Sequence, residues 1–369
     1  MRIGFDAKRA FLNTSGLGNY SRNTLNALKS YYPENQYTLF TPEVKFGLMQ
    51  NQELFDIVSP EDSKSKLKKS IWRSLQLGKE LSQYNLNLFH GLSNELPGGI
   101  HKTQVPALVT IHDLIFIRYP GFYKPVDRAI YHRKIKYACS SANKIIAISG
   151  QTKNDIVEFM GTAPNKIEII HQAVSPLFFE KADTEKIKLK YNLPDNFIIS
   201  VGTVEERKNQ LSTLNAVYNE KIDIPVIFVG KPTSYNNDLH KYIAEKGMKK
   251  QVTFLKNIPE SDLAALYQLA ELSIYISVFE GFGLPVIEAM ACGCPVITSN
   301  VSCLPETAGD AAVLCSPGNV EELGSQIKRL LSDSDLKEDW IKKGKKRAQL
   351  FHPKIYAEKL ISLYSEISQ

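Results

Sequence analysis

The fold is decided by residues 272–291, which read LSIYISVFEGFGLPVIEAMA. A short apolar run of strand length, Leu272–Ser277, is followed by a turn with two glycines and by a helical segment that begins near Pro285. A strand, a glycine-rich turn and a helix N-terminus form an anion site, because N–H groups and the helix dipole point at an incoming phosphate. An ordinary strand–turn–helix junction, with Glu288 as a surface charge, has the same pattern. Taken alone, the turn leaves both interpretations open.

Similar apolar runs alternate with helical segments along most of the chain. The predicted strands are Arg2–Phe5, Tyr37–Phe40, Leu86–Phe89, Ala107–Ile111, Lys144–Ile148, Phe197–Val201, Val226–Val229, Val252–Leu255, Leu272–Ser277 and Val296–Thr298. The predicted helices between them include Tyr20–Ser30, Tyr123–Cys139, Gln210–Val217 and Ser261–Ala270. Continuous apolar strands are typical of parallel sheets that helices cover on both faces. The alternation therefore predicts an α/β architecture.

The strands and helices fall into two series, which predict two doubly wound Rossmann-like domains that face a central cleft. We expect the first domain over residues 1–174 and the second over 175–352, with the proline-containing stretch Val174–Asp195 at the connection. One large open sheet is the alternative. Ligands of such sheets bind beyond the carboxyl ends of the strands, so the functional residues should follow the predicted strands.

Composition excludes several classes of protein. The 369 residues carry a formal net charge of +6, far from the clustered excess of a nucleic-acid-binding protein. No apolar run is long enough to span a membrane, and the N-terminal residues lack the pattern of a signal peptide, so we expect a cytoplasmic protein. The five cysteines form no metal-binding or disulfide pattern and are predicted to be buried.

Three further segments place polar residues after predicted strands. Arg207 and Lys208 follow the strand Phe197–Val201, where two cations would neutralise a diphosphate, or where a solvated loop would pair them with neighbouring glutamates. The first strand is followed by a loop with Gly16 and Gly18, which lacks the third glycine of a dinucleotide-binding fingerprint and disfavours NAD. His112 ends the strand Ala107–Ile111, either as a ligand contact or as a buried structural histidine.

The order and spacing of these motifs resemble a known family. Gly16-Leu-Gly18, Thr110-Ile-His112-Asp113, Glu206-Arg207-Lys208-Asn209 and Glu280-x7-Glu288 together resemble the retaining nucleotide-sugar glycosyltransferases of family 4, which have the GT-B fold. The likeness runs from the first strand to about Leu331. One departure is His171-Gln172-Ala173-Val174, where many members have a turn similar to Asn-Gly-Val-Asp.

The resemblance implies a role for each matching residue. The catalytic group would comprise Glu280 at the donor sugar, Arg207 and Lys208 at the departing diphosphate, and His112 approaching the transferred sugar from the first domain. The donor-binding group would comprise Glu288 at the ribose, the backbone of Phe282, Gly283 and Leu284 at the diphosphate, Asn257 and Ile258 beside the base, and Gly16 and Gly18 leaving room for the donor. The C-terminal helix 353–369 would cross back to the first, acceptor-binding domain, while the second domain binds the donor.

The implied reaction is transfer of a hexose to a glycan or lipid-linked acceptor in surface polysaccharide or glycoconjugate synthesis. On overall resemblance the donor is GDP-mannose, and the configuration is retained. Paired cations can stabilise the leaving diphosphate, so we expect an enzyme with a nucleotide-sugar co-substrate, no metal and no other cofactor. The one Asp-x-Asp motif, Asp333-Ser334-Asp335, precedes a predicted helix and is explained by capping.

A basic segment, Lys64–Leu81, has an apolar stripe of Leu67, Ile71, Leu75 and Leu81 at helical spacing. It would bind an anionic membrane at the inner face, or pack its stripe on the domain core with the lysines in solvent.

Two other function classes stay open at this point. A nucleotide-sugar epimerase or a sugar phosphorylase would use the same fold. A non-catalytic polyanion-binding protein fits the net charge but leaves the Glu280 and Glu288 spacing unexplained.

Overall fold

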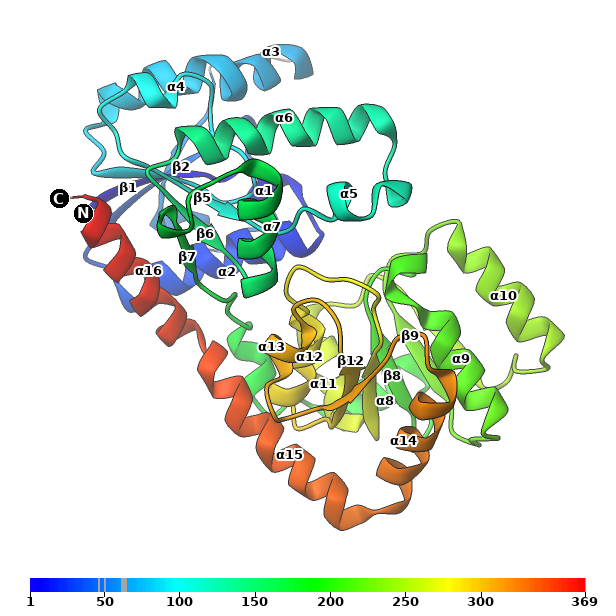
Figure 1. Cartoon of the computed structure of the whole chain (residues 1–369). Helices are drawn as coiled ribbons and strands as arrows, with labels where there is room; N and C mark the ends of the chain where they lie inside the picture. Colours follow the sequence, from blue (N-terminus) through cyan, green and yellow to red (C-terminus); the bar gives the residue numbers. More distant parts are fainter. Residues whose placement is uncertain (46, 50, 61–64, 369) are drawn as a thin grey trace. The chain divides into compact units, whose positions relative to one another are not determined.

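The computed structural model describes residues 1–45, 47–49, 51–60 and 65–368. The chain divides into two compact units (Figure 1). Unit 1 comprises Met1–Ala173 and Pro353–Gln369, and unit 2 comprises Val174–His352. The stretch expected as a connection packs within unit 2, where Lys190 and Tyr191 both bond to Asp262 at 2.6 and 2.7 Å.

Unit 1 is a parallel sheet of seven strands in the order β3-β2-β1-β4-β5-β6-β7. Its strands are β1 (Arg2–Asp6), β2 (Gln36–Phe40), β3 (Asp56–Val58), β4 (Leu88–Gly91), β5 (Ala107–Ile111), β6 (Lys144–Ala147) and β7 (Ile167–Ile169). Its helices are α1 (Lys8–Leu12), α2 (Gly16–Tyr31), α3 (Lys66–Ile71), α4 (Leu77–Glu80), α5 (Ile115–Arg118), α6 (Pro125–Ser141), α7 (Gly150–Met160) and α16 (Pro353–Ile367). Two apolar clusters lie on the two faces of the sheet, which explains why the inner strands are mostly apolar on both of their faces.

Unit 2 is a parallel sheet of six strands in the order β10-β9-β8-β11-β12-β13. Its strands are β8 (Ile198–Val201), β9 (Val226–Val229), β10 (Val252–Leu255), β11 (Leu272–Tyr275), β12 (Val296–Ser299) and β13 (Val313–Cys315). Its helices are α8 (Thr184–Tyr191), α9 (Gln210–Asn219), α10 (Tyr235–Glu245), α11 (Glu260–Leu269), α12 (Leu284–Ala291), α13 (Leu304–Ala308), α14 (Val320–Ser332) and α15 (Ser334–Ala348). The strand order reverses between β8 and β11, which is the classical ligand-binding point of a doubly wound sheet.

The predicted fold class, two doubly wound α/β domains, is confirmed, and the alternative of one large open sheet is excluded. All ten predicted strands are present, but β3, β7 and β13 were missed. Each of these three lies at a sheet edge and has three residues, so its apolar run is too short to stand out.

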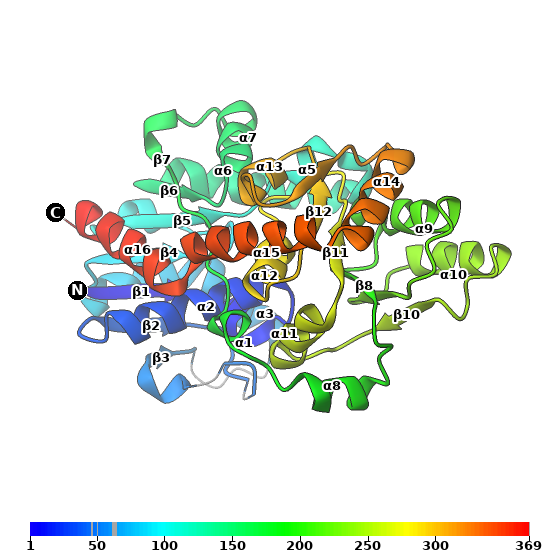
Figure 2. The ribbon, with the colours of Figure 1, turned by 90° about the horizontal axis from the view of Figure 1, so that it is seen from below.

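The C-terminal helix α16 packs on α2 in unit 1, as predicted (Figures 1 and 2). The Tyr356 hydroxyl lies 2.9 Å from both the Thr24 and Tyr20 hydroxyls, and the Tyr364 hydroxyl lies 2.7 Å from Nδ1 of His90. The side chains of these residues are buried, so the last turns of the chain are part of the unit 1 core.

The five cysteines are buried and free, as predicted. The Asp-x-Asp motif is also a cap, since Oδ1 of Asp333 accepts a hydrogen bond from the Leu336 N–H at 2.9 Å at the start of α15.

Candidate functional site

Side chains that follow β8 and β11 meet at the reversal point of the unit 2 sheet. Arg207 Nη1 and Lys208 Nζ lie 2.8 and 2.6 Å from the same carboxylate oxygen, Oε1 of Glu280. The two cations come from the loop after β8, and the carboxylate comes from the turn after β11. Because β8 and β11 are neighbouring parallel strands, their carboxyl ends bring these loops together. Three of the predicted catalytic residues are therefore one contact cluster.

The two cations have further partners inside the same unit. Arg207 also donates to the Phe279 carbonyl at 2.7 Å and to Glu205 at 2.5 Å. Lys208 donates to the Tyr275 hydroxyl, and its Nζ lies 4.7 Å from the centre of that ring. The side chains of Arg207 and Lys208 are only 15% and 12% exposed, so the prediction of a solvated loop is wrong, although Glu205 does pair with Arg207.

Glu280 is held at both its backbone groups and its carboxylate. Its N–H donates to the Ser302 hydroxyl at 3.1 Å, and the Cys303 thiol donates to its carbonyl at 3.2 Å. Burial opposes its charge, but Lys208 and Arg207 outweigh burial and lower the pKa of Glu280 to about 2. Glu280 is therefore ionised throughout the physiological range.

The glycine turn after β11 is tightly built. Gly283 has a φ of +94°, and a Cβ at this position would lie 2.5 Å from the Leu304 side chain, so glycine is required for both reasons. Phe282 is buried with its ring centre 5.7 Å from that of Phe351, and its carbonyl accepts a hydrogen bond from the Thr307 hydroxyl. Leu284 is the first residue of α12, and Pro285 lies in its first turn, as predicted. A rigid turn of this kind is preorganised for an anion.

Glu288 lies in α12, and its environment is the opposite of that of Glu280. Burial and the nearby Glu260 carboxylate raise the pKa of Glu288 to about 8, although the Tyr267 hydroxyl opposes the shift. Two carboxyl groups of one strand–turn–helix segment are thus pushed to different protonation states at neutral pH: Glu280 is ionised, and Glu288 is mostly protonated. Such a separation of pKa values is typical of functional sites.

Asn257 and Ile258 lie between β10 and α11, at the carboxyl edge of the same sheet. Asn257 is exposed and has a left-handed backbone with a φ of 56°. Ile258 is half-buried. Both positions belong to the edge that carries Arg207 and Glu280, and their role beside a base stays a prediction.

The three predicted residues of unit 1 differ in their surroundings. Gly16 begins α2, and a Cβ there would meet nothing within 4 Å, so it borders open space. A Cβ at Gly18 would lie 1.9 Å from the Asn13 carbonyl oxygen, so its own loop requires glycine there, and the role of both glycines beside the donor stays a prediction. His112 is buried after β5, and burial lowers its pKa to about 4. Its ring is therefore neutral at physiological pH.

Sequence reasoning missed several residues that contact the predicted site residues within each unit. Tyr275 and Ser302 contact Lys208 and Glu280, and Tyr20 packs edge-on against His112 with ring centres 4.5 Å apart. Tyr275 lies in an apolar strand and Tyr20 lies in a helix, where an aromatic side chain is usually a core residue, so their residue types carried no signal. Ser302 has a left-handed backbone with a φ of 55°, which the sequence does not indicate for a serine.

Both units match family models of glycosyltransferases. Residues 14–176 match the model of Glycosyltransferase Family 4, and residues 181–347 match that of Glycosyl transferases group 1. The O-antigen chain mannosyltransferase B of Escherichia coli is 30% identical over 280 residues, which are 73% of this chain and 72% of that protein. The chain belongs to glycosyltransferase family 4.

Other relatives fit the same family. The serotype-specific mannosyltransferase WbdA of Escherichia coli is 29% identical over 266 residues, which are 68% of this chain and 32% of that longer protein. The crystal structure of Anabaena Alr3699/HepE in complex with UDP-glucose matches this glycosyltransferase with a TM-score of 0.80 over 99% of this chain and 100% of that chain, at 17% identity. That likeness shows that the glycosyltransferase has the GT-B fold of its structural neighbours.

Proposed function

We propose that the enzyme transfers mannose from GDP-mannose, with retention of configuration, to a glycan or lipid-linked acceptor in the synthesis of a surface polysaccharide or glycoconjugate. The binding of a nucleotide-sugar donor is supported by one observation: Arg207 and Lys208 both contact Glu280 where the strand order of unit 2 reverses. Mannose and the acceptor class are supported by the names of relatives that are mannosyltransferases of O-antigen chains.

In the proposed reaction the bond between C1 of the sugar and the diphosphate oxygen breaks, and a bond from the acceptor oxygen to C1 forms on the same face. The electron pair of the broken bond leaves with the diphosphate, whose oxygen takes the acceptor proton. Arg207 and Lys208 stabilise the negative charge that develops on this leaving group. This route needs no covalent intermediate with the protein.

The surroundings of Glu280 support this route over a covalent one. Its Oε1 already accepts from two cations, and a carboxylate with a pKa of about 2 is a weak nucleophile. Glu280 is better suited to orient Lys208 and a sugar hydroxyl than to attack C1. Trapping of a glycosyl group on Glu280 would contradict the proposal.

A panel of nucleotide sugars tests the function directly. The chain is heated with GDP-mannose, GDP-fucose, UDP-glucose and UDP-galactose, each with EDTA and with Mg²⁺ or Mn²⁺, and the melting temperature is measured. We expect the largest rise with GDP-mannose, and the same rise with EDTA, because the two cations supply the positive charge. Product analysis then separates a new glycosidic bond from an epimerised nucleotide sugar or phosphorolysis. Activity that requires an added metal would contradict metal independence.

Donor binding is expected to release about one proton from Glu288 at pH 7. In the free chain the raised pKa of about 8 keeps Glu288 mostly protonated at pH 7. Two ribose hydroxyls that donate hydrogen bonds to the Glu288 carboxylate would favour its ionised form in the complex. Donor affinity should therefore rise as the pH increases to about 8 and level off above it. Isothermal titration calorimetry in phosphate and in Tris measures the proton, because the apparent binding enthalpies then differ by the buffer ionisation enthalpy.

The matched control for this measurement is Glu288→Gln, which has no proton to release and should give equal enthalpies in the two buffers. Equal apparent binding enthalpies in the two buffers with the unchanged chain would show that Glu288 does not accept hydrogen bonds from the ribose as proposed.

Membrane contact by the basic segment of unit 1 is also part of the proposal. Lys64 and the side chain of Leu67 lie outside the described residues. Ile71 and Leu75 are 38% and 62% exposed, whereas Leu81 is buried, so the predicted stripe is divided between solvent and core. Between α3 and α4 the chain forms a π-helical turn, η2 (Trp72–Gln76), which shifts the buried face by one residue. Exposed apolar side chains beside lysines favour an interfacial helix.

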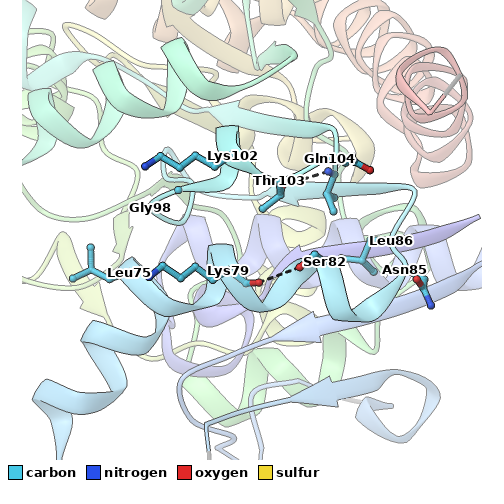
Figure 3. A pocket seen from close by; sticks show the side chains of 11 residues that line it. Leu75, Lys79, Ser82, Asn85, Leu86, Gly98, Lys102, Thr103 and Gln104 are labelled. Atoms are coloured by element: carbon cyan, nitrogen blue, oxygen red, sulfur yellow. Dashed lines mark hydrogen bonds between the residues drawn. The ribbon is translucent and has the colours of Figure 1, made fainter.

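A pocket of about 880 Å³ adjoins this segment (Figure 3). Lys79 and Lys102 line it together with Leu75 and polar side chains, at the amino edge of β4 and β5 and so at the opposite sheet edge from His112. Its lining has two cations and no carboxylate, which suits a lipid phosphate. No helix in the described part of the chain is long and apolar enough to cross a bilayer.

Vesicle sedimentation tests the membrane contact. The chain is expected to sediment with vesicles of phosphatidylglycerol at low salt, and the bound fraction should fall severalfold when Ile71→Glu and Leu75→Glu are combined. The control is Leu189→Glu, which changes a leucine that is 82% exposed on α8 of unit 2. No sedimentation of the unchanged chain at low salt, or an equal loss with the control, would remove the membrane from the proposal.

A further inference from the structure

Both ring nitrogens of His112 have partners in unit 1, and the partners fix the tautomer. Nε2 lies 2.9 Å from the Leu92 carbonyl oxygen. A carbonyl oxygen only accepts, so Nε2 carries the proton of the neutral ring. Nδ1 therefore presents its lone pair and needs a donor.

That donor is the side-chain amide of Gln172, whose nitrogen lies 3.4 Å from Nδ1. Gln172 is 6% exposed and His112 is 4% exposed, so neither group is satisfied by bulk solvent. Gln172 lies two residues before unit 2 begins at Val174, within the segment that departs from the usual turn of the family. A glutamine here has a physical reason, because aspartate or glutamate would offer Nδ1 only acceptors.

The rest of His112 is rigidly held. Its N–H donates to the Asn94 side chain at 2.7 Å, its carbonyl accepts from the Thr152 hydroxyl at 3.2 Å, and the Tyr20 ring packs edge-on against the imidazole. The Leu92 partner is a backbone carbonyl and cannot leave without moving the chain. The Gln172 partner is a flexible side chain at the long end of hydrogen-bond distance. Nδ1 is thus the position at which an incoming hydroxyl can replace a protein group.

We propose that Gln172 is a positioning residue: its uncharged side chain leaves Nδ1 of His112 unprotonated, and its amide yields this nitrogen to a hydroxyl of the transferred sugar. The inference rests on the proposed function for the identity of the ligand, but the Gln172–His112 pairing is a property of the free chain. The enzyme should therefore prefer a sugar with a hydroxyl at the matching position. A deoxy sugar would displace the Gln172 amide from Nδ1 without supplying a hydroxyl in its place.

The charged and titratable groups near His112 agree with a neutral acceptor. Arg9 of α1 and the buried His90 of β4 are its electrostatic neighbours, and Tyr20 of α2 is its ring contact. A positive neighbour and a second buried imidazole both disfavour protonation of the ring. His90 is itself neutral, since burial and His112 lower its pKa to about 3.

Two substitutions of Gln172 test the proposal. Gln172→Glu places an acceptor against Nδ1 and should draw a proton onto it, which makes His112 a cation with no lone pair. Gln172→Met has a similar length and no charge, so Nδ1 keeps its lone pair. The readout in the free chain is the ¹⁵N chemical shift of the His112 ring nitrogens at pH 7. We expect an unprotonated Nδ1 in the unchanged chain and in Gln172→Met, and a protonated Nδ1 in Gln172→Glu.

The kinetic readout separates positioning from packing. kcat/KM for the donor should fall about 10- to 100-fold in Gln172→Glu, the range expected for a lost buried hydrogen bond, and less than about 3-fold in Gln172→Met. Gln36→Glu, the same change at an exposed position at the start of β2, is the control and should leave both readouts unchanged. Equal losses in the two Gln172 variants would indicate packing alone and overturn the proposal.

Failure of this inference differs from failure of the proposed function. A protonated Nδ1 in the unchanged chain, or an unprotonated one in Gln172→Glu, contradicts the pairing whatever reaction the enzyme catalyses. The ¹⁵N shifts can follow the expected pattern while no nucleotide sugar serves as donor. In that case the Gln172–His112 pairing is supported, but the proposed donor and the proposed contact between the sugar and Nδ1 are both wrong.

Discussion

Replacing Lys208 by methionine is expected to lower kcat about 10²- to 10³-fold, the loss typical of one preorganised donor to a developing negative charge. Methionine keeps most of the side-chain volume and removes the charge that would face the departing diphosphate. The protein should stay folded, because Glu280 keeps its contact with Arg207 at 2.8 Å. The measurement is the initial rate of transfer at saturating donor, with circular dichroism to check the fold.

The control for this substitution is Lys249→Met. Lys249 is exposed and precedes β10, so it lies at the amino edge of the sheet, away from Arg207 and Glu280. We expect no change in rate from it. A Lys208→Met enzyme that keeps more than about a tenth of the activity would show that the leaving group is stabilised by other groups.

Replacing Arg73 by methionine is expected to cost about 3–5 kcal/mol of unfolding free energy, because it leaves a buried carboxylate without its cation. Arg73 lies in η2 and binds Asp6, with Nη2 2.5 Å and Nε 2.9 Å from Oδ2, and it binds Glu95 through Nη1 at 2.7 Å. Its side chain is 7% exposed. Arg73 of the basic segment Lys64–Leu81 is therefore buried in an ion-pair cluster and faces neither solvent nor a membrane surface.

Unit 1 can be followed by itself in this experiment. The chain has two tryptophans, Trp72 in η2 and Trp340 in α15, so a Trp340→Phe background leaves Trp72 fluorescence as a reporter of unit 1. Urea unfolding then gives the free energy. Lys134→Met is the control, because Lys134 binds Glu95 at 3.2 Å while 44% exposed, and its loss should cost less than about 1 kcal/mol. Equal costs for the two variants would contradict the role of burial.

The same cluster predicts a pH dependence. Burial opposes ionisation of Glu95, but Arg73 and Lys134 outweigh it and lower its pKa to about 2. A carboxyl group with a lowered pKa stabilises the fold above its unfolded pKa of about 4.3, and this contribution is lost as the pH falls toward 2. The Arg73→Met variant should lose less stability than the unchanged chain over this acid range.

The fold could be predicted from the sequence where strands are buried on both faces. The runs at Ala107–Ile111 and Val226–Val229 are buried at every residue, because helices cover both sides, and apart from Thr110 they are apolar, which is a strong signal. The edge strands lack it, since β7 is exposed at two of its three residues. The stripe of Lys64–Leu81 was misread for another reason: a period of 3.6 residues does not describe a segment with a π-helical turn.

The site could be predicted in outline and not in its contacts. Arg207, Lys208 and Glu280 each follow a strand, and parallel topology brings such positions to one sheet edge. No spacing in the sequence indicates that both cations bind one oxygen of Glu280, or that Gln172 would reach His112 across sixty residues of chain. Those contacts depend on side-chain rotamers and loop conformation, which local sequence does not determine.

The arrangement of Arg207 and Lys208 has a consequence for selectivity among the anions of the cell. Both cations form ion pairs in the free chain: Arg207 with Glu205 and Glu280, and Lys208 with Glu280. A single inorganic phosphate or sulfate must compete with an internal carboxylate that is always present at the highest possible effective concentration. An anion that makes several contacts with the protein can displace these carboxylates from the cations, because its other contacts contribute binding free energy. A small free ion makes few other contacts and displaces them poorly. If the two cations bind the donor diphosphate, we expect inhibition by inorganic phosphate or sulfate to be weak.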